Sequence, residues 1–110
     1  MDKLIKEEFF KEFSINEDYF LSTGLDWTEL EKIYEDYVSL VPLLEKEAEY
    51  VVSKLIDVSS VHSVRRRVKK PSHLIEKIIR KGKKYQERNI SVDNYKEIVT
   101  DLIGIRVLHL

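Results

Sequence analysis

The sequence predicts an α+β fold, in which helices lead into a strand, a further helix and a second strand. Apolar residues recur every three or four positions through residues 26–57, as they do on one face of a helix. Residues 61–69 alternate with a period of two, which is typical of a strand. The apolar segment 102–110 contains Ile and Val, which favour strands. With 110 residues, the chain can form one domain with a modest core.

The amino-terminal half should be helical throughout. One or two short helices are expected within residues 2–23, and Gly24 should end them. Asp26 or Thr28 can cap the long helix that follows. Pro42 lies inside this helix and should kink it or split it in two, because proline removes one backbone hydrogen bond and clashes with the preceding turn.

A second, shorter helix should follow the first strand. Pro71 suits the first position of a helix, since its fixed φ is helical and its missing N–H is not needed there. The helix should run to Lys81 or Lys84, with an apolar side and a basic side. Residues 82–94 are expected to form a polar loop, and residues 95–100 a short helical turn. The basic side would gather His73, Lys77, Arg80, Lys81 and Lys84.

Charge is strongly segregated along the chain. Residues 1–61 hold 6 Lys and no Arg against 15 acids, a net charge of −9, whereas residues 62–88 hold 11 Lys or Arg against 2 Glu, a net charge of +9. Residues 89–110 add −1. Either an acidic part supports a basic part that meets anions, or two oppositely charged faces pack together. We therefore divide the chain into an acidic helical region, residues 1–60, and a second unit, residues 61–110.

Several classes of protein do not fit this composition. The chain has no Cys, so it can form neither disulfides nor thiolate metal sites. Its apolar runs are too short to span a bilayer, and residues 1–13 mix Lys and Glu without the apolar stretch of a signal peptide. The three His residues lack the spacing of a zinc enzyme. We expect a cytoplasmic protein with no membrane partner.

Basic side chains converge where the first strand ends and the next helix begins. Arg67 and Lys69 alternate onto one strand face, Lys77 projects from the helix, and the helix start at Pro71 adds backbone N–H groups and a partial positive charge. A triphosphate requires such a cradle, since its transfer is catalysed mainly by positioning and charge stabilisation. Asp101, the only acid of the apolar carboxy-terminal segment, is of the type that ligates a hard cation.

Two segments, RVKKPSHLIEKIIRK (67–81) and VTDLIGIRVLHL (99–110), together carry a family resemblance. They resemble the opening motifs of the synthetase domain of the RelA/SpoT family of alarmone synthetases, and in particular small alarmone synthetases. The resemblance implies the first strand, helix and strand of a mixed-sheet, nucleotidyltransferase-like domain. It also implies a GTP pyrophosphokinase, which uses Mg²⁺ and transfers the pyrophosphate of ATP to the ribose 3'-hydroxyl of GTP or GDP.

The resemblance assigns roles to five residues. Arg67 and Arg106 would contact the adenine nucleotide, with the Arg106 guanidinium lying against the base. Lys69 and Lys77 would bind the phosphates of ATP. Asp101 would be the catalytic carboxylate and the Mg²⁺ ligand.

Three further residues belong to the same motifs. Four residues before Lys77, where the family usually has Ser, this chain has His73, with Ser72 one position earlier. Either Ser72 takes the family role after a small shift, or His73 donates to a phosphate itself. Gly104 would allow the backbone to approach a ligand or the neighbouring strand closely.

Other elements of the family site come later than the second motif: a guanine-stacking Tyr, further basic residues and the Glu that completes the metal site. We therefore expect this chain to be the amino-terminal part of a synthetase and to have no synthetase activity by itself. One alternative is the toxin-like branch of the family, which transfers pyrophosphate to tRNA 3' ends; the basic helix would suit tRNA as well as ATP. An alternative of another class is a non-catalytic nucleotide-binding or regulatory module.

The two predicted strands make a sheet that is marginal in water and has an unpaired backbone edge. The acidic helices can cover one face of this sheet but not its edge. We expect either self-association through the edge, giving a homo-oligomer, or partial disorder after about Asn89, unless more chain follows.

Overall fold

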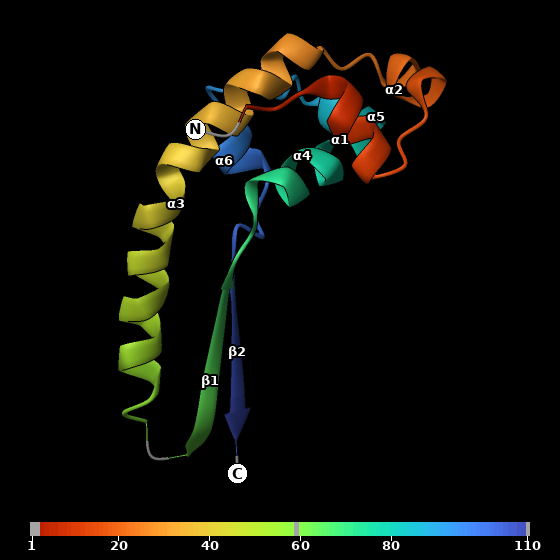
Figure 1. Cartoon of the computed structure of the whole chain (residues 1–110). Coiled ribbons are helices and arrows are strands. Elements are labelled where there is room, and N and C mark those ends of the chain that lie inside the picture. Colours follow the sequence, from red (N-terminus) through yellow and green to blue (C-terminus); the bar gives the residue numbers. More distant parts are fainter. Residues whose placement is uncertain (1–2, 59, 110) are drawn as a thin grey trace.

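The computed structural model describes residues 3–58 and 60–109, and it has the predicted α+β character (Figure 1). Within these ranges, three helices precede the first strand, three more lie between the strands, and the two strands form one antiparallel sheet. Both predicted strands and the helix that starts at Pro71 are confirmed. In chain order the elements are α1 (Lys6–Glu12), α2 (Glu17–Thr23), α3 (Trp27–Leu55), β1 (Val61–Val68), α4 (Pro71–Arg80), α5 (Gly82–Glu87), α6 (Tyr95–Ile98) and β2 (Ile103–His109).

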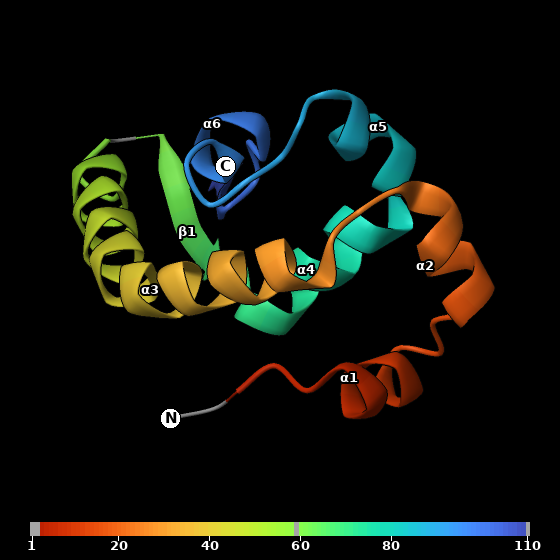
Figure 2. The same ribbon diagram turned by 90° about the horizontal axis from the view of Figure 1, so that it is seen from above.

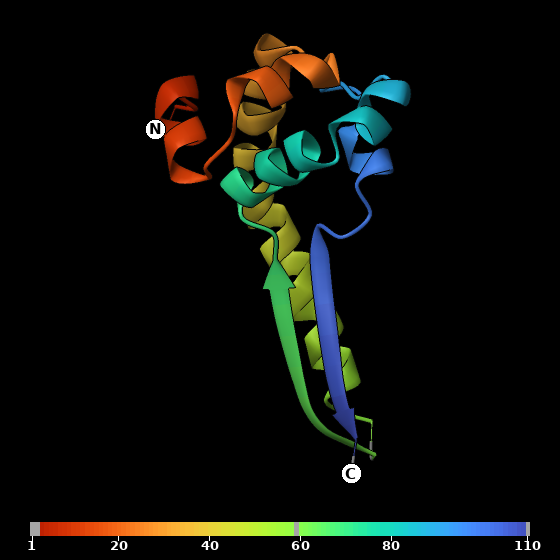
Figure 3. The same cartoon turned by 90° about the vertical axis from the view of Figure 1, so that its right-hand side faces the viewer.

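The described chain has a helical head and a protruding arm (Figures 1 and 3). The shorter helices gather around the first half of α3, whereas the second half of α3 runs beside the two strands. The Cα radius of gyration is 16.4 Å and the principal extents are 52 × 27 × 26 Å. A compact chain of this length would have a radius of gyration of about 13 Å. The arm therefore exposes much of its surface.

The core of the head is aromatic on one side and aliphatic on the other. The rings of Phe9, Phe10 and Phe20 surround Trp27, with centroid separations of 5.9, 5.6 and 6.1 Å. These distances suit tilted and edge-to-face packing. The apolar side of α4 is buried against this cluster and α3, as the periodicity predicted, through Leu74, Ile75, Ile78 and Ile79.

Local signals in the helical half explain where its helices begin and end. Gly24 adopts φ +75°, a left-handed conformation that glycine tolerates, and ends α2. Asp26, not Thr28, caps α3, because its carboxylate accepts a hydrogen bond from the Thr28 N–H at 3.1 Å. Pro42 does not split the helix, which continues to Leu55 but changes direction in its middle (Figures 1 and 2).

The polar loop predicted for residues 82–94 is wrong in its first half. Gly82–Glu87 forms α5, and the polar sequence concealed it because the short helix buries only Gly82 and Tyr85. Contacts with α2 fix the break before α5: the Tyr19 hydroxyl donates to the Arg80 carbonyl at 2.7 Å, at the end of α4. The short helical turn expected after the loop is confirmed as α6.

The sheet pairs β1 with β2 in antiparallel register, from Val68 opposite Ile103 to Val61 opposite His109, with an irregularity between Val61 and Ser63. α3 packs along one face, over which Leu44 and Ala48 are buried. In the described ranges nothing is packed on the opposite face, and the sheet has no third strand. No helix within these ranges is both long and apolar enough to cross a bilayer.

Candidate functional site

Three of the predicted site residues meet where the arm joins the head. Lys69 follows β1, Lys77 lies on the second turn of α4, and Asp101 precedes β2. The Lys69 Nζ lies 3.3 Å from Asp101 Oδ2, and the Lys77 Nζ lies 2.8 Å from Asp101 Oδ1. We call this Lys–Asp–Lys cluster the ion triad. Backbone pairing helps to build it, because the Lys69 N–H donates to the Leu102 carbonyl at 2.8 Å and so continues the ladder beyond β1.

The two lysines of the ion triad are much less exposed than the carboxylate. The side chains of Lys69 and Lys77 are 11% and 15% exposed, whereas that of Asp101 is 49% exposed. Burial by itself would raise the pKa of Asp101, but its hydrogen bond with Lys77 and its interactions with Lys69 outweigh burial and hold that pKa below its usual value. Asp101 is therefore ionised at neutral pH, and the ion triad carries a net charge of +1.

Tyr37 supports the ion triad from the core side. It is fully buried on α3, and its hydroxyl donates to the Lys69 carbonyl at 2.6 Å. Burial, followed by the negative charges of Asp101 and Glu45, raises the pKa of Tyr37 to about 12. The neutral phenol therefore holds the backbone of Lys69 against α3 over the whole physiological range of pH.

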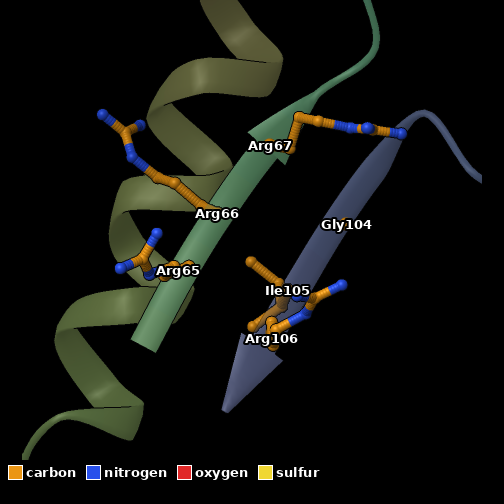
Figure 4. Close-up of a pocket in the computed structure, with 6 residues that line it drawn as sticks. All are labelled: Arg65, Arg66, Arg67, Gly104, Ile105 and Arg106. Carbon is orange, nitrogen blue, oxygen red and sulfur yellow. The ribbon is translucent and has the colours of Figure 1, made fainter. Parts of the chain in front are cut away.

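Three arginines share the open face of the sheet. Arg65 pairs directly with Arg106 and Arg67 with Gly104, so the side chains of the three arginines point to the same side, away from α3. All three are exposed, and none has an ion-pair partner among residues 3–58 and 60–109. They border a shallow hollow of about 460 Å³ along the two strands (Figure 4). We call this surface the arginine face.

Arg66 lies on the other side of β1 and has a structural role. Its guanidinium contacts Glu45 at 3.2 Å and Glu49 at 3.3 Å, and Figure 4 shows it reaching toward α3 while Arg67 extends toward β2. The second explanation of the charge segregation, packing of opposite charges, therefore holds for Arg66, whereas the first stays a prediction. One arginine packs against the acidic helix, and its neighbours on either side remain available for anions.

The start of α4 contains the two residues that could take the role of the family Ser. Ser72 is half-buried on the first turn, and His73 is exposed. The His73 ring packs edge-to-face on Phe13, with 6.0 Å between centroids. Among the described residues no side chain caps this end of the helix, so the first backbone N–H groups of α4 have no side-chain partner there. Neither residue contacts the ion triad through a hydrogen bond in the described structure, and the choice stays open.

The continuous basic side predicted for the helix after Pro71 is wrong in extent. α4 ends at Arg80, so Lys84 belongs to a different helix. Lys77 is engaged with Asp101, and the Arg80 Nε is bound to Glu76 at 2.8 Å. The other two, Lys81 and Lys84, lie beyond the end of α4 and in α5, and neither belongs to the ion triad.

Gly104 is not needed for close approach of the neighbouring strand, which was one of the two roles expected of it. A Cβ atom at this position would meet only the Arg67 carbonyl oxygen, at 3.9 Å, an ordinary contact. The neighbouring strand therefore leaves room for a side chain. Close approach of a ligand remains a prediction.

The donor set at Asp101 fits only one kind of magnesium site. Within the described ranges, no three His, Cys, Asp or Glu side chains are grouped so as to hold a metal ion. Mg²⁺, however, is commonly bound through one or two carboxylates together with substrate phosphates and water. Asp101 can supply one such carboxylate, provided that phosphate accompanies the ion.

Sequence reasoning missed two residues of this region. Arg65 had a signal, since its alternation with Arg67 already placed it on the same strand face. Tyr37 had none, because its hydroxyl contacts a residue 32 positions away and its helical spacing indicated only a core residue.

Comparison of the chain with models of known families, with curated proteins and with solved structures finds no match.

Proposed function

We propose that this chain is the amino-terminal part of a GTP pyrophosphokinase of the RelA/SpoT type, and that it provides the ATP side of the active site. The observation that carries the proposal is that Lys69, Lys77 and Asp101 lie in contact next to the arginine face, where the arm joins the head. The two sequence motifs contain the same three residues. In this proposal, the domain continues with nucleotidyltransferase-like topology and works in the cytoplasm.

Electrostatics supports binding of a triphosphate. Lys69 presents an ammonium group just after β1 and Lys77 presents another from α4, and Arg67 and Arg106 add guanidinium groups on the adjoining face. A ligand with about four negative charges would gain several contacts at once, as transfer of a pyrophosphoryl group requires. Arginine can also stack on an aromatic base, so the arginine face suits adenine as well as phosphate.

Mg²⁺ is the proposed cofactor, with Asp101 as its carboxylate ligand in this segment. When bound, it would neutralise charge on the phosphates of ATP. The remaining tasks belong to the chain itself: the lysines hold the phosphates, the arginine face orients the nucleotide, and Tyr37 keeps Lys69 in place.

The first test is binding of ATP by the chain, measured by titration calorimetry at low and high salt. We expect Lys77→Gln to weaken binding at least about tenfold, by analogy with the loss of one charge-assisted contact, and higher salt to weaken it further. Lys96→Gln is the matched control, since Lys96 is exposed on α6. Equal affinity in the two variants would remove Lys77 from the phosphate site.

The second test is product analysis of the longer protein to which we assign this segment. With ATP, GTP and Mg²⁺ it should form AMP and pppGpp, and Asp101→Asn should slow the reaction at least about 100-fold, as the loss of one preorganised charge contact does. Labelled tRNA 3' ends as the only product would instead indicate the toxin-like acceptor, for which the exposed Lys81, Lys83 and Lys84 are suited. Binding of ATP without any product would indicate a regulatory module.

A further inference from the structure

Both carboxylate oxygens of Asp101 make ion pairs within the chain. One lies 2.8 Å from the Lys77 Nζ and the other 3.3 Å from the Lys69 Nζ. These are the only ion pairs that the two lysines make within residues 3–58 and 60–109. The carboxylate thus takes the place of the anion that these lysines would bind.

Exposure indicates which member of the ion triad can leave. The lysines are largely covered, and the backbone of Lys69 is held by hydrogen bonds to Leu102 and Tyr37, whereas half of the Asp101 side chain is exposed just before β2. An anion that approaches the lysines therefore meets the carboxylate, and like charges at this distance repel each other. Phosphate oxygens and carboxylate oxygens also compete for the same N–H donors.

Asp101 has a reason to occupy the lysines when no ligand is bound. Two nearly covered ammonium groups without a counter-ion would be costly, because burial penalises the charged form. The carboxylate offsets that cost. A phosphate that replaces it supplies more negative charge to the same two donors and leaves Asp101 unpaired.

We infer that Asp101 is a displaceable internal counter-ion, which lowers the affinity of the Lys69–Lys77 pair for polyphosphate and is released when polyphosphate binds. The inference rests on the proposed function only in taking these lysines as the phosphate site. It adds an order of events, in which phosphate binds first and frees the carboxylate. Before phosphate binds, Asp101 partly blocks the two lysines. The apparent affinity is reduced by the fraction of molecules in which the lysines are paired with Asp101.

The test uses inorganic tripolyphosphate without divalent cations, titrated into the 110-residue chain by calorimetry. Asp101→Asn should bind about two- to twentyfold more tightly than the wild type, the range expected for losing two partly exposed ion pairs. Asp93→Asn makes the same change in net charge at an exposed acid that has no ion pair in the described structure, and it should bind almost as the wild type does.

A double variant separates competition from a general effect of charge. In a Lys77→Gln background, the gain from Asp101→Asn should shrink, because the carboxylate then masks one lysine instead of two. If Asp101→Asn gains no more than Asp93→Asn, the counter-ion role is wrong, while the phosphate site and the proposed function stand. If no variant binds tripolyphosphate, the lysines are not a phosphate site, and both proposals are overturned.

The wild-type chain offers a measurement that does not depend on whether Asp101→Asn folds. The carboxyl carbon of Asp101 can be followed by NMR while tripolyphosphate is added. Release from the two lysines should shift this resonance in step with binding, whereas a purely structural carboxylate would keep its position. An unchanged resonance at saturation would contradict displacement.

Discussion

Tyr37 illustrates how a single buried hydroxyl connects the core to the candidate site. Its pKa is raised to about 12 by burial first, and then by the charges of Asp101 and Glu45. Because the folded pKa lies above the ordinary value of 10.0, the fold favours the protonated phenol. The stability that this contributes is complete below pH 10 and is lost as the pH rises from 10 toward 12.

We expect Tyr37→Phe to flatten the alkaline part of the stability curve. At neutral pH the variant should lose about 1 kcal/mol, because the Lys69 carbonyl loses its donor. Between pH 10 and 12 the wild type should lose up to about 1.4 kcal/mol per pH unit more than the variant. Urea unfolding at several pH values would measure both effects.

The control for this experiment is Tyr50→Phe, since Tyr50 is 64% exposed. It should leave the alkaline slope unchanged. Tyr95 also has a raised pKa, from burial and from its hydrogen bond to Asp36, so part of the slope should remain in Tyr37→Phe. A variant that follows the wild type through pH 12 would show that Tyr37 ionises freely in the folded protein.

At the scale of elements, the corner between α4 and α5 depends on Gly82. A Cβ atom there would lie 2.4 Å from Cγ2 and 2.6 Å from Cβ of Thr23, on the α2 side of the corner. Thr23 cannot easily give way, since its hydroxyl donates to the Phe20 carbonyl and accepts from the Leu25 N–H. α5 must therefore shift if any side chain is added.

We expect Gly82→Ala to destabilise the protein by about 1–3 kcal/mol, the usual cost of overpacking. This reverses the helix-propensity expectation that alanine is better than glycine by up to about 1 kcal/mol. Gly104→Ala is the matched control, because its Cβ atom would meet nothing closer than 3.9 Å. Thermal unfolding of both variants measures this difference. Equal melting temperatures would mean that α2 and α5 can shift apart without strain.

The elements that the sequence predicted well are those whose signals are local. These signals depend on residues next to one another in the chain. They are the cap at Asp26 and the left-handed glycine just before it, the proline at the start of α4, and the alternation of side chains along β1. α5 was missed because its position is set by α2, through Tyr19 and Thr23, more than 50 residues earlier in the chain. No window of the sequence contains that contact.

At the scale of the molecule, the site could be anticipated only in part. Motif resemblance placed Lys69, Lys77 and Asp101 in one site, and the structure brings them together. It did not anticipate that they would pair with one another, because the resemblance assigns each residue a contact with the ligand and none with the other two. The position of the arginine face on a protruding arm, open on one side, likewise depends on the bend of α3 and on the register of two strands.

The arm also predicts how the chain behaves in solution. Its sheet has only two strands in the described ranges, so each strand has an unpaired edge. Leu108 of β2 is 55% exposed beside one of these edges. Residues after Asn89 are tied to α3, for example by the Val92 N–H donating to Glu29 at 2.9 Å, which favours association of folded chains over local disorder. We propose that two copies of the chain pair through the edge of β2.

Sedimentation across a range of concentrations should therefore show a reversible oligomer of the 110-residue chain. Leu108→Lys should weaken it, because a lysine beside an edge strand opposes pairing with another chain. Leu43→Lys is the control, since Leu43 is 59% exposed on α3 and belongs to neither strand, and it should leave association unchanged. Amide exchange should be measured as well, because it reports how strongly the two strands are protected. If the wild type is a monomer at all concentrations and both strands are strongly protected, the arm closes its own edges and β2 is not an association surface.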